Sequence, residues 1–280
     1  MVYEKRDIIL HVDDLSVAYG DKVIIQNINI MEHNVVRKGA TQGQIVAVLG
    51  RSGRGKSTLF RALTGLLAPH KGRVMIPDYS KQPADGLQPA KIVHEGDVGF
   101  VDQKYTLFRH KTVFSALLFS MRNLPLSGKE KEEKVMAYLV EWGLEKAKNQ
   151  YPNELSGGQR QRVAIIEQLL SSGHYLVLDE PFSGLDVGNI KNAKASFDLI
   201  ESANELNTII FSTHDIELAV ELADSIYIIG YPKAQQGNLE NIGTVVGHFD
   251  LKEMGIAWRN TFDTDHLELS NEIKRVMLES

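Results

Sequence analysis

The sequence predicts an α/β fold in three layers, built around a sheet of parallel strands. Short and continuously apolar runs, such as Ile45–Leu49, have the length and composition of strands that are buried on both faces. In the second half of the chain these runs alternate with helical segments, which is the pattern of consecutive β–α–β units. A glycine-rich loop follows the first apolar run and opens a helix, as in folds that bind a ligand at the carboxyl ends of their strands.

The first hundred residues are expected to add an antiparallel β edge to this core. Residues 8–30 read as short strands that turn at Gly20-Asp21. Residues 32–43 are polar and end in glycine, so they are expected to form an extended hairpin loop. Residues 77–96 are rich in proline, glycine and charge, which indicates a surface loop. The other elements expected in this part are strands over 45–49 and 98–101 and a helix from Lys56 to about Leu67.

Residues 104–162 look helical and inserted between two parts of the core. Beyond them the strands and helices alternate regularly. The elements expected are helices over 112–121, 129–142 and 158–170, a strand over 175–179, a helix over 189–202, a strand over 208–212, a helix over 216–222 and a strand over 225–229.

The tail is expected to contain one strand and a final helix. In that helix Asp265 with Glu268 resembles a capping box. Its apolar face is formed by Leu269, Ile273, Val276 and Met277. These expectations divide the chain into a main unit over 1–235, with its core at 1–103 and 163–235 and a helical subdomain at 104–162, and a C-terminal extension over 236–280.

Composition excludes several classes of protein. The 280 residues carry 31 Lys and Arg against 36 Asp and Glu, a net charge of −5 that weighs against a general nucleic-acid binder. The chain has no cysteine, so disulfides and thiolate metal sites are excluded. The charged start lacks the apolar core of a signal peptide, and no run is long enough to span a bilayer. Any membrane role is therefore expected to pass through a partner.

The segment Gly50-x4-Gly55-Lys56-Ser57 has the pattern of a phosphate-binding loop. It follows a buried strand and opens a helix, which is the context that this pattern requires. Glycines let backbone N–H groups converge on phosphate oxygens, and the helix N-terminus favours an anion. Lys56 is expected to reach the β- and γ-phosphates, and the Ser57 hydroxyl to bind Mg²⁺.

Two adjacent carboxylates end the apolar strand over 175–179. Asp179 and Glu180 lie where α/β proteins place their ligands. Successive strand side chains point to opposite sides, so neighbouring residues take different roles. Asp179 is expected to hold the metal, and Glu180 to orient and polarise the attacking water.

A second glycine motif, Ser156-Gly157-Gly158-Gln159, begins another helix with exposed N–H groups. A simple helix cap would explain the serine, which is a favoured N-cap residue. Two glycines followed by Gln-Arg-Gln-Arg are more than a cap needs, and we expect a second anion site here.

These stretches together resemble the ATP-binding cassette (ABC) ATPases, a family defined by such a signature between the two Walker motifs. The resemblance covers about residues 8–230 and implies a P-loop NTPase (RecA-like) fold with ATP and Mg²⁺ as ligands. It implies nucleotide contacts from Tyr19, Gly50, Ser52, Gly53, Gly55, Lys56, Ser57, Thr58, Gln103, Ser156, Gly157, Gly158, Gln159 and Asp186. It implies metal contacts from Ser57, Gln103 and Asp179, and catalysis by Glu180, His214 and Lys56.

Four of these positions also have plain structural explanations. In the family the counterpart of Tyr19 stacks on adenine, that of Gln103 touches Mg²⁺ and senses the membrane partner, and that of His214 is a switch histidine. Asp186, in Ser183-Gly184-Leu185-Asp186, matches a loop that crosses a dimer. A packing aromatic, an exposed glutamine, a satisfied histidine and a helix cap would fit the same residues.

The resemblance also implies partners and a place in the cell. Two such subunits meet head to tail, with ATP between Walker A of one and the signature of the other. A homodimer, transmembrane permease subunits, a solute-binding protein acting indirectly and the cytoplasmic face of the cell membrane are therefore expected. The apolar side chains that follow Gln103 fit either a docking groove for the permease or internal packing equally well; they are Tyr105, Leu107, Phe108 and Phe114.

The subgroup that the chain resembles is the importers of nitrate, sulfonate and taurine, because Tyr151-Pro152-Asn153-Glu154 precedes the signature. One departure from the family follows the signature, where Ile166, Glu167 and Gln168 replace a small residue and an arginine. Helix packing and a salt bridge are expected to differ there. Lipid or lipoprotein extraction, a soluble non-transport ATPase and a silent regulatory partner remain alternatives to solute import.

Overall fold

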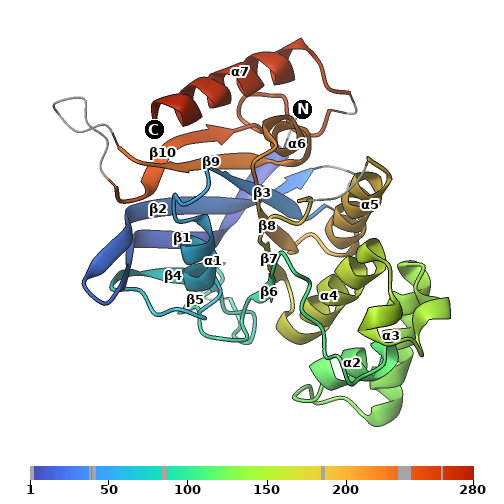
Figure 1. Cartoon of the computed structure of the whole chain (residues 1–280). Coiled ribbons are helices and arrows are strands. Elements are labelled where there is room, and N and C mark those ends of the chain that lie inside the picture. The colour runs from blue at the N-terminus through green and yellow to red at the C-terminus, as the bar shows by residue number, and fades with distance from the viewer. Residues whose placement is uncertain are drawn as a thin grey trace.

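The computed structural model describes residues 3–37, 39, 42–83, 87–183, 187–232, 241–259 and 261–280, with 187–190, 192 and 193 described by their backbone alone. Within these ranges a six-stranded sheet forms the centre, in the order β10-β9-β3-β8-β7-β6 (Figure 1). All neighbouring pairs are parallel except β10 with β9. The strands are β3 (Gln44–Leu49), β6 (Gly99–Val101), β7 (Tyr175–Leu178), β8 (Thr208–Thr213), β9 (Ser225–Gly230) and β10 (Thr244–Asp250).

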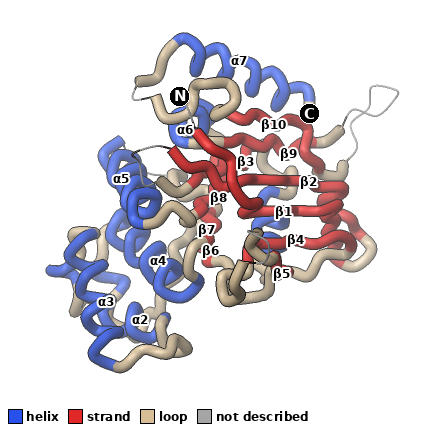
Figure 2. The backbone as a smooth tube through the Cα atoms, turned by 180° about the vertical axis from the view of Figure 1, so that it is seen from behind, coloured by secondary structure: helices blue, strands red, loops and turns tan. Residues whose placement is uncertain are grey.

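A second sheet of antiparallel strands lies beside the first, as the view from behind shows (Figure 2). Its order is β2-β1-β4-β5, and β1 turns into β2 at Gly20-Asp21, as the sequence predicts. Tyr19 pairs with Lys22 across that turn. The strands are β1 (Tyr3–Tyr19), β2 (Lys22–Arg37), β4 (Lys71–Pro77) and β5 (Ala90–Ile92).

The alternation of side chains along β3 builds the three layers. Ile45, Ala47 and Leu49 point into a core shared with the helices, while Val46 and Val48 point into a core shared with β1, β2 and α1. All six residues of β3 are buried, which explains the unbroken apolar run from Ile45 to Leu49. The helices are α1 (Lys56–Leu63), α4 (Gly157–Ser172), α5 (Val187–Ala203), α6 (Ile216–Leu222) and α7 (Thr264–Glu279). The three-layer α/β fold with an antiparallel edge is thus confirmed.

The helical region between β6 and β7 extends away from both sheets (Figure 1). It comprises α2 (Val113–Ser120), α3 (Gly128–Glu141) and two 3₁₀ turns, η1 (Glu145–Ala147) and η2 (Pro152–Glu154). Thr112 caps α2, and Ser127 with Glu130 forms a capping box on α3. The boundary predicted at residue 162 falls inside α4, which packs on α2 and on the core, so the division into units stays a prediction.

Three sequence expectations in the first hundred residues were wrong. Residues 32–37 are not a loop, because β2 continues to Arg37. Glu32 is buried and has partners far along the chain: the Tyr227 hydroxyl donates to its carboxylate, and Lys252 Nζ lies 3.6 Å from it. The surface loop over 77–96 contains β5, and the preceding strand β4 was missed. Helix α1 ends at Leu63, before the left-handed Gly65.

The final helix lies where the sequence predicts it, but its cap is different. Asp263, rather than Asp265, accepts the first backbone N–H groups, and His266 rather than Glu268 completes the box. The expected apolar face is confirmed, with Leu269 and Ile273 fully buried. In the described part of the chain no helix has the length and hydropathy needed to cross a membrane.

Candidate nucleotide-binding site

The loop between β3 and α1 is held open by backbone conformations that favour glycine. Gly50, Gly53 and Gly55 all have positive φ values, of 154°, 79° and 103°. A Cβ atom on Gly50 would collide with the carbonyl oxygen of Ile229, and one on Gly55 with the Ile25 side chain. Side chains are excluded at these two positions, so the backbone N–H groups that precede α1 stay accessible.

Lys56 is the first residue of α1 and its side chain is buried at the loop. Its Nζ donates to the carbonyl oxygen of Gly50 at 2.6 Å and to that of Arg51 at 3.4 Å. Burial lowers the pKa of Lys56, and the carboxylates of Glu180 and Asp179 oppose that shift. The ammonium group is therefore held in place facing the two acids.

Asp179 and Glu180 follow β7, at the carboxyl edge of the parallel sheet. The hydroxyl of Ser212, on the neighbouring β8, donates to Asp179 Oδ1 at 2.7 Å and accepts from the Glu180 N–H at 2.9 Å. One serine thus fixes both acidic residues. Ser212 has no local sequence signal of this role, because only the β7–β8 pairing brings it beside the acids.

Glu180 is the centre of the charged groups. Its Oε1 lies 3.9 Å from Lys56 Nζ, and its Oε2 lies 3.6 Å from His214 Nδ1. The backbone of Glu180 is left-handed, with φ of 49°, which is costly for a residue other than glycine. Lys56, Glu180 and His214, to which the family resemblance assigns catalysis, come from three separate parts of the chain and lie close together.

The loop after β6 reaches the acidic strand end through side-chain hydrogen bonds. Gln103 Nε2 donates to Ser183 Oγ at 3.1 Å. Both Tyr105, at 2.6 Å, and the buried Gln161 of α4, at 2.8 Å, donate to the carbonyl oxygen of Pro181. The helix that carries the second glycine motif is therefore connected to the acidic loop by Gln161. This residue belongs to the Gln-Arg-Gln-Arg run noted in the sequence, but its contact with Pro181 was not predicted.

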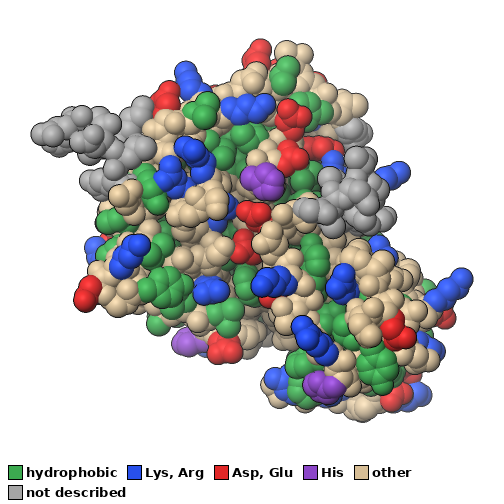
Figure 3. All heavy atoms as spheres, in the orientation of Figure 1, with side chains coloured by type: hydrophobic (Ala, Val, Ile, Leu, Met, Phe, Trp, Pro, Cys, Tyr) green, Lys and Arg blue, Asp and Glu red, His purple; other side chains and the backbone are tan. Residues whose placement is uncertain are grey.

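A cavity of about 470 Å³ collects most of the predicted residues. It also includes Ile24 of β2, which the sequence analysis did not single out. Acidic side chains and a histidine gather at the centre of this face, with Lys and Arg around them (Figure 3). The predicted residues that line the cavity are Ser52, Gly53, Gly55, Lys56, Ser57, Thr58, Gln103, Asp179 and Glu180.

The remaining predicted residues do not line this cavity. Tyr19 is 44% exposed at the end of β1. Ser156 to Gln159 lie at the start of α4, where Ser156 and Gln159 form a reciprocal capping box with bonds of 2.9 and 3.3 Å. The cap that we weighed as the plain explanation is thus present, and Gly157 has open space beside it. Asp186 lies outside the described residues.

The phosphate-binding loop is also in contact with the end of the chain. The guanidinium of Arg54 lies 3.7 Å from the centroid of the Tyr231 ring and donates to the carbonyl oxygen of Ser280 at 3.2 Å. The Tyr231 hydroxyl donates to the carbonyl oxygen of Gly53 at 3.3 Å. These contacts join the loop to β9 and α7, and the sequence did not predict them.

Comparison with known proteins agrees with this geometry. The family described as ABC transporter matches residues 34–183. The sulfate/thiosulfate import ATP-binding protein CysA of Synechocystis sp. is 34% identical over 236 residues, which are 83% of this chain. The chain spans only 60% of the length of that relative.

Two solved structures resemble the whole fold. One is cbiO1 of Clostridium perfringens, part of the ABC transporter complex cbiONQ, with a TM-score of 0.69, 25% identity and coverage of 98% of both chains. The other is the ATP-binding cassette MJ0796, a dimer in a post-hydrolysis state with ADP and Pi, with a TM-score of 0.62, 24% identity and coverage of 86% of this chain and 98% of that one. On the family match, the relative and the fold together, the chain belongs to the ABC transporter family.

Proposed function

We propose that this chain is the ATP-binding subunit of an import ABC transporter and that it hydrolyses ATP to power transport. The observation that carries the proposal is the meeting of Lys56, Glu180 and His214 beside a glycine-lined loop. A triphosphate and a water molecule need this combination of amide donors, a cation and a base. The family and the import function of the Synechocystis relative support it.

Each of the three residues has a distinct role in the proposed reaction. Lys56 neutralises charge on the β- and γ-phosphates, in a geometry fixed by its bonds to the loop carbonyls. Glu180 orients the attacking water and polarises it towards the γ-phosphorus. His214 lies beside the other carboxylate oxygen of Glu180, where its role is to contact the γ-phosphate or to hold Glu180 in position. The Ser212 hydroxyl keeps the Glu180 backbone in place.

The oxygen donors in the cavity fit a magnesium ion. The Ser57 hydroxyl, the Gln103 amide and the Asp179 carboxylate all line it, and Mg²⁺ prefers such hard ligands together with phosphate oxygens. No cluster of three or more acidic or histidine side chains suited to a metal occurs among the residues that the structure describes. The site therefore suits an ion that has few protein ligands and that is also bound by the phosphates of the nucleotide. Such an ion, when bound, would neutralise charge on the leaving phosphates.

The signature completes the site from a second subunit. At the start of α4, Ser156 and Gly157 are exposed, do not line the chain's own cavity and lie at the positive end of a 16-residue helix. Two copies related head to tail place this end against the γ-phosphate of the facing copy. ATP binding then favours the closed pair, and hydrolysis favours separation. A homodimer is the simplest form of this pair. In it, Tyr19 stacks on the adenine, and Asp186 belongs to the loop that crosses between the two subunits.

The partners outside the pair are membrane permease subunits. The chain sits against them on the cytoplasmic face of the membrane, and a solute-binding protein acts through them without contacting this chain. Sulfate and thiosulfate are the first solutes to test, because the Synechocystis relative is named for them. The nitrate, sulfonate and taurine group remains the alternative that the segment before the signature favours.

The test measures ATP hydrolysis at increasing concentrations of the purified chain. A shared site requires the rate per molecule to rise with concentration as pairs form, and to saturate. Addition of the membrane subunits in vesicles is expected to make hydrolysis depend on the transported solute. A rate per molecule that stays constant on dilution, with the chain monomeric throughout, contradicts the paired site.

A further inference from the structure

The Arg54 side chain packs on the outer side of the phosphate-binding loop. Gly53 and Gly55, its neighbours in the sequence, line the nucleotide cavity, while Arg54 is not among the described residues that do so. Its guanidinium lies 3.7 Å from the centroid of the Tyr231 ring, just beyond the end of β9. The cation within the loop is therefore used to hold an aromatic ring behind it.

Tyr231 in turn contacts the backbone of the loop. A loop that points its N–H groups at phosphates turns its carbonyl groups outward, and these groups need donors of their own. Lys56 bonds to two of the carbonyl oxygens, and the Tyr231 hydroxyl donates to that of Gly53 at 3.3 Å. The N–H of the same peptide group, on Arg54, donates to the carbonyl oxygen of Arg51 at 3.4 Å. The peptide plane between Gly53 and Arg54 is thus held from both ends.

The outer side of the loop is closely packed against residues far along the chain. Ser280 is buried, and Arg54 donates to its carbonyl oxygen at 3.2 Å. A Cβ atom on Gly230 would collide with Ser280, and one on Gly243 would collide with the carbonyl oxygen of Arg54. Tyr231 follows Gly230 directly, so this packing also fixes the backbone that carries the ring.

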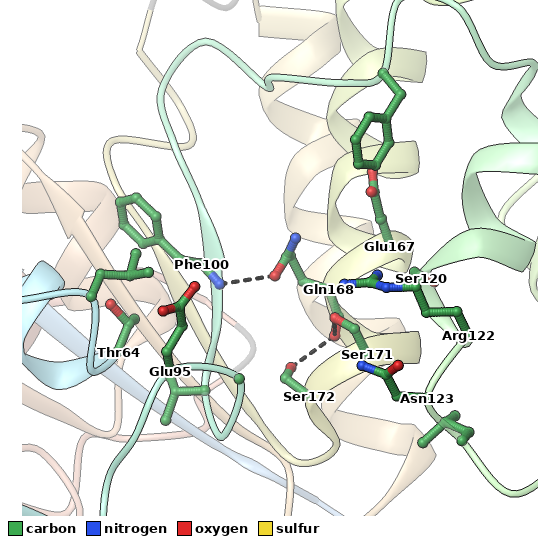
Figure 4. Close-up of a pocket in the computed structure, with 15 residues that line it drawn as sticks. Thr64, Glu95, Phe100, Ser120, Arg122, Asn123, Glu167, Gln168, Ser171 and Ser172 are labelled. Atoms are coloured by element: carbon green, nitrogen blue, oxygen red, sulfur yellow. Dashed lines mark hydrogen bonds between the residues drawn. The ribbon is translucent and has the colours of Figure 1, made fainter.

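A second arginine makes the same kind of contact at a different place. The guanidinium of Arg122 lies 4.6 Å from the centroid of the Phe119 ring and donates to the Phe119 carbonyl oxygen at 3.4 Å. Arg122 lines a cavity of about 490 Å³ between the core and the helical region, together with Glu95 and Asn123 (Figure 4). The described residues that line this cavity and those that line the nucleotide cavity form two separate sets. Arg122 is therefore a matched comparison for Arg54.

We propose that Tyr231 is a positioning residue for ATP and that Arg54 acts through it. The Tyr231 hydroxyl orients the Gly53 peptide, and the stacked guanidinium holds the ring where the hydroxyl reaches that peptide. The inference rests on the proposed function, since it concerns how tightly the same site binds ATP. Lys56 has its own bonds to the loop, and Ser212 holds the acids. Loss of the Tyr231 contact therefore weakens nucleotide binding and leaves turnover at saturating ATP unchanged.

Tyr231→Phe in the full chain removes the hydroxyl and keeps the ring. It is expected to raise the dissociation constant of ATP about fivefold, the usual effect of losing one hydrogen bond, and to raise KM by the same factor. At one fixed concentration of the chain, kcat should equal that of the parent. Titration with a fluorescent ATP analogue and Mg²⁺, and steady-state hydrolysis, measure these constants. Tyr138→Phe, the same change on α3, is the matched control and is expected to bind ATP like the parent.

Arg54→Gln tests whether the arginine acts through the ring. It is expected to weaken ATP binding about threefold, as for loss of one cation–π contact, whereas Arg122→Gln should leave ATP binding unchanged. In a Tyr231→Ala chain there is no ring to hold, so Arg54→Gln should add little to the loss. Two independent effects would instead multiply.

An ATP dissociation constant of Tyr231→Phe equal to that of the parent overturns the proposal. So does a lower kcat with an unchanged KM, because that result indicates loss of folded protein, which thermal melting verifies. Effects of Arg54→Gln and Tyr231→Ala that multiply overturn the role of Arg54. A parental chain that binds ATP without hydrolysing it overturns the proposed function, while the binding constants still decide the role of Tyr231. A parental chain that binds no ATP overturns both.

Discussion

The loop around Lys56 and the start of α4 are both glycine-rich helix N-termini, yet their surroundings differ. The first is enclosed: Lys56 is 7% exposed and lies within 3.9 Å of Glu180, and Ser212 fixes the acids beside it. The second is open: Ser156 and Gly157 are exposed, and Ser156 forms the capping box of the helix with Gln159. The first terminus thus holds opposing charges close together, and the second holds a helix cap.

This difference shows why a helix N-terminus alone does not make a reaction site. Both termini attract an anion through the helix dipole. Among the described residues, the first is the terminus beside the residues to which we assign the base, the cation and the metal ligands. The second can add binding energy to the nucleotide site of another subunit, and the proposed pair of subunits uses it in this way. Substitutions at the first terminus should therefore change the rate of hydrolysis, and substitutions at the second should change the association of two subunits.

Glu180→Gln should have the largest effect on turnover. Removing the base is expected to reduce the hydrolysis rate at least about a hundredfold while ATP still binds, so closed pairs accumulate. Rapid-quench hydrolysis and gel filtration with ATP measure the two effects. Glu205→Gln, on the turn between α5 and β8, is the matched control. Hydrolysis at the parental rate in Glu180→Gln would remove Glu180 from the role of base.

Ser156→Arg tests the open terminus. A bulky cation there is expected to block pairing and to lower hydrolysis roughly thirtyfold, the effect of losing an interface contact worth about 2 kcal/mol. Each monomer should still bind nucleotide, because Ser156 does not line the chain's own cavity. Fluorescent-nucleotide titration and light scattering separate the two outcomes. ATP-dependent pairing equal to the parent's would contradict the shared site.

Ser212→Ala should have a smaller effect on the enclosed site. It removes one hydrogen bond to Asp179 and one from the Glu180 N–H, and a loss of about 1.4 kcal/mol corresponds to a tenfold lower kcat. ATP affinity should change little, because the phosphate loop is untouched. Ser225→Ala, a buried serine of β9 that bonds to His248, is the control. Equal kcat values in the two variants would mean that Ser212 does not position the acids.

Glu201→Gln should leave both termini unchanged and alter stability alone. Burial, and then the nearby Asp224, raises the pKa of Glu201 from 4.5 to about 8. A raised carboxyl pKa favours the folded state below about pH 4.5, and this contribution is lost as the pH rises through about 8. As the pH rises from about 4.5 to about 8, the free energy of unfolding of the variant should therefore increase relative to that of the parent. The increase is at most about 1.4 kcal/mol per unit of pKa shift. Urea unfolding at about pH 5 and pH 9 measures it; a constant difference would contradict the shift.

Local sequence predicted the parts of the fold that local chemistry determines. Apolar runs such as β3 and β8, and capped helices such as α6, appear at or near their predicted bounds. Nine of the ten residues that line the nucleotide cavity were also expected, some from the glycine pattern and the strand-end acids and others, such as Gln103, from the family resemblance. These features depend on backbone conformation and periodicity, which neighbouring residues carry.

Features that depend on distant partners could not be predicted in this way. The polar end of β2 looked like a loop because Glu32 is compensated by Tyr227 and Lys252, far away in sequence. Strand β4 is exposed over its first three residues and lacks a continuous apolar run. Ser212 and Gln161 became part of the site description only when sheet pairing and helix packing placed them.

The tie between Arg54 and the end of α7 has a practical consequence. Any shift of the phosphate loop on closing over ATP must either move Ser280 with it or break the 3.2 Å bond. A dye attached near the last turn, on the exposed Leu278, would thus report loading of the nucleotide as a change in emission, without labelling the loop itself. Movement of α7 would in this way report movement of the loop that contains Arg54.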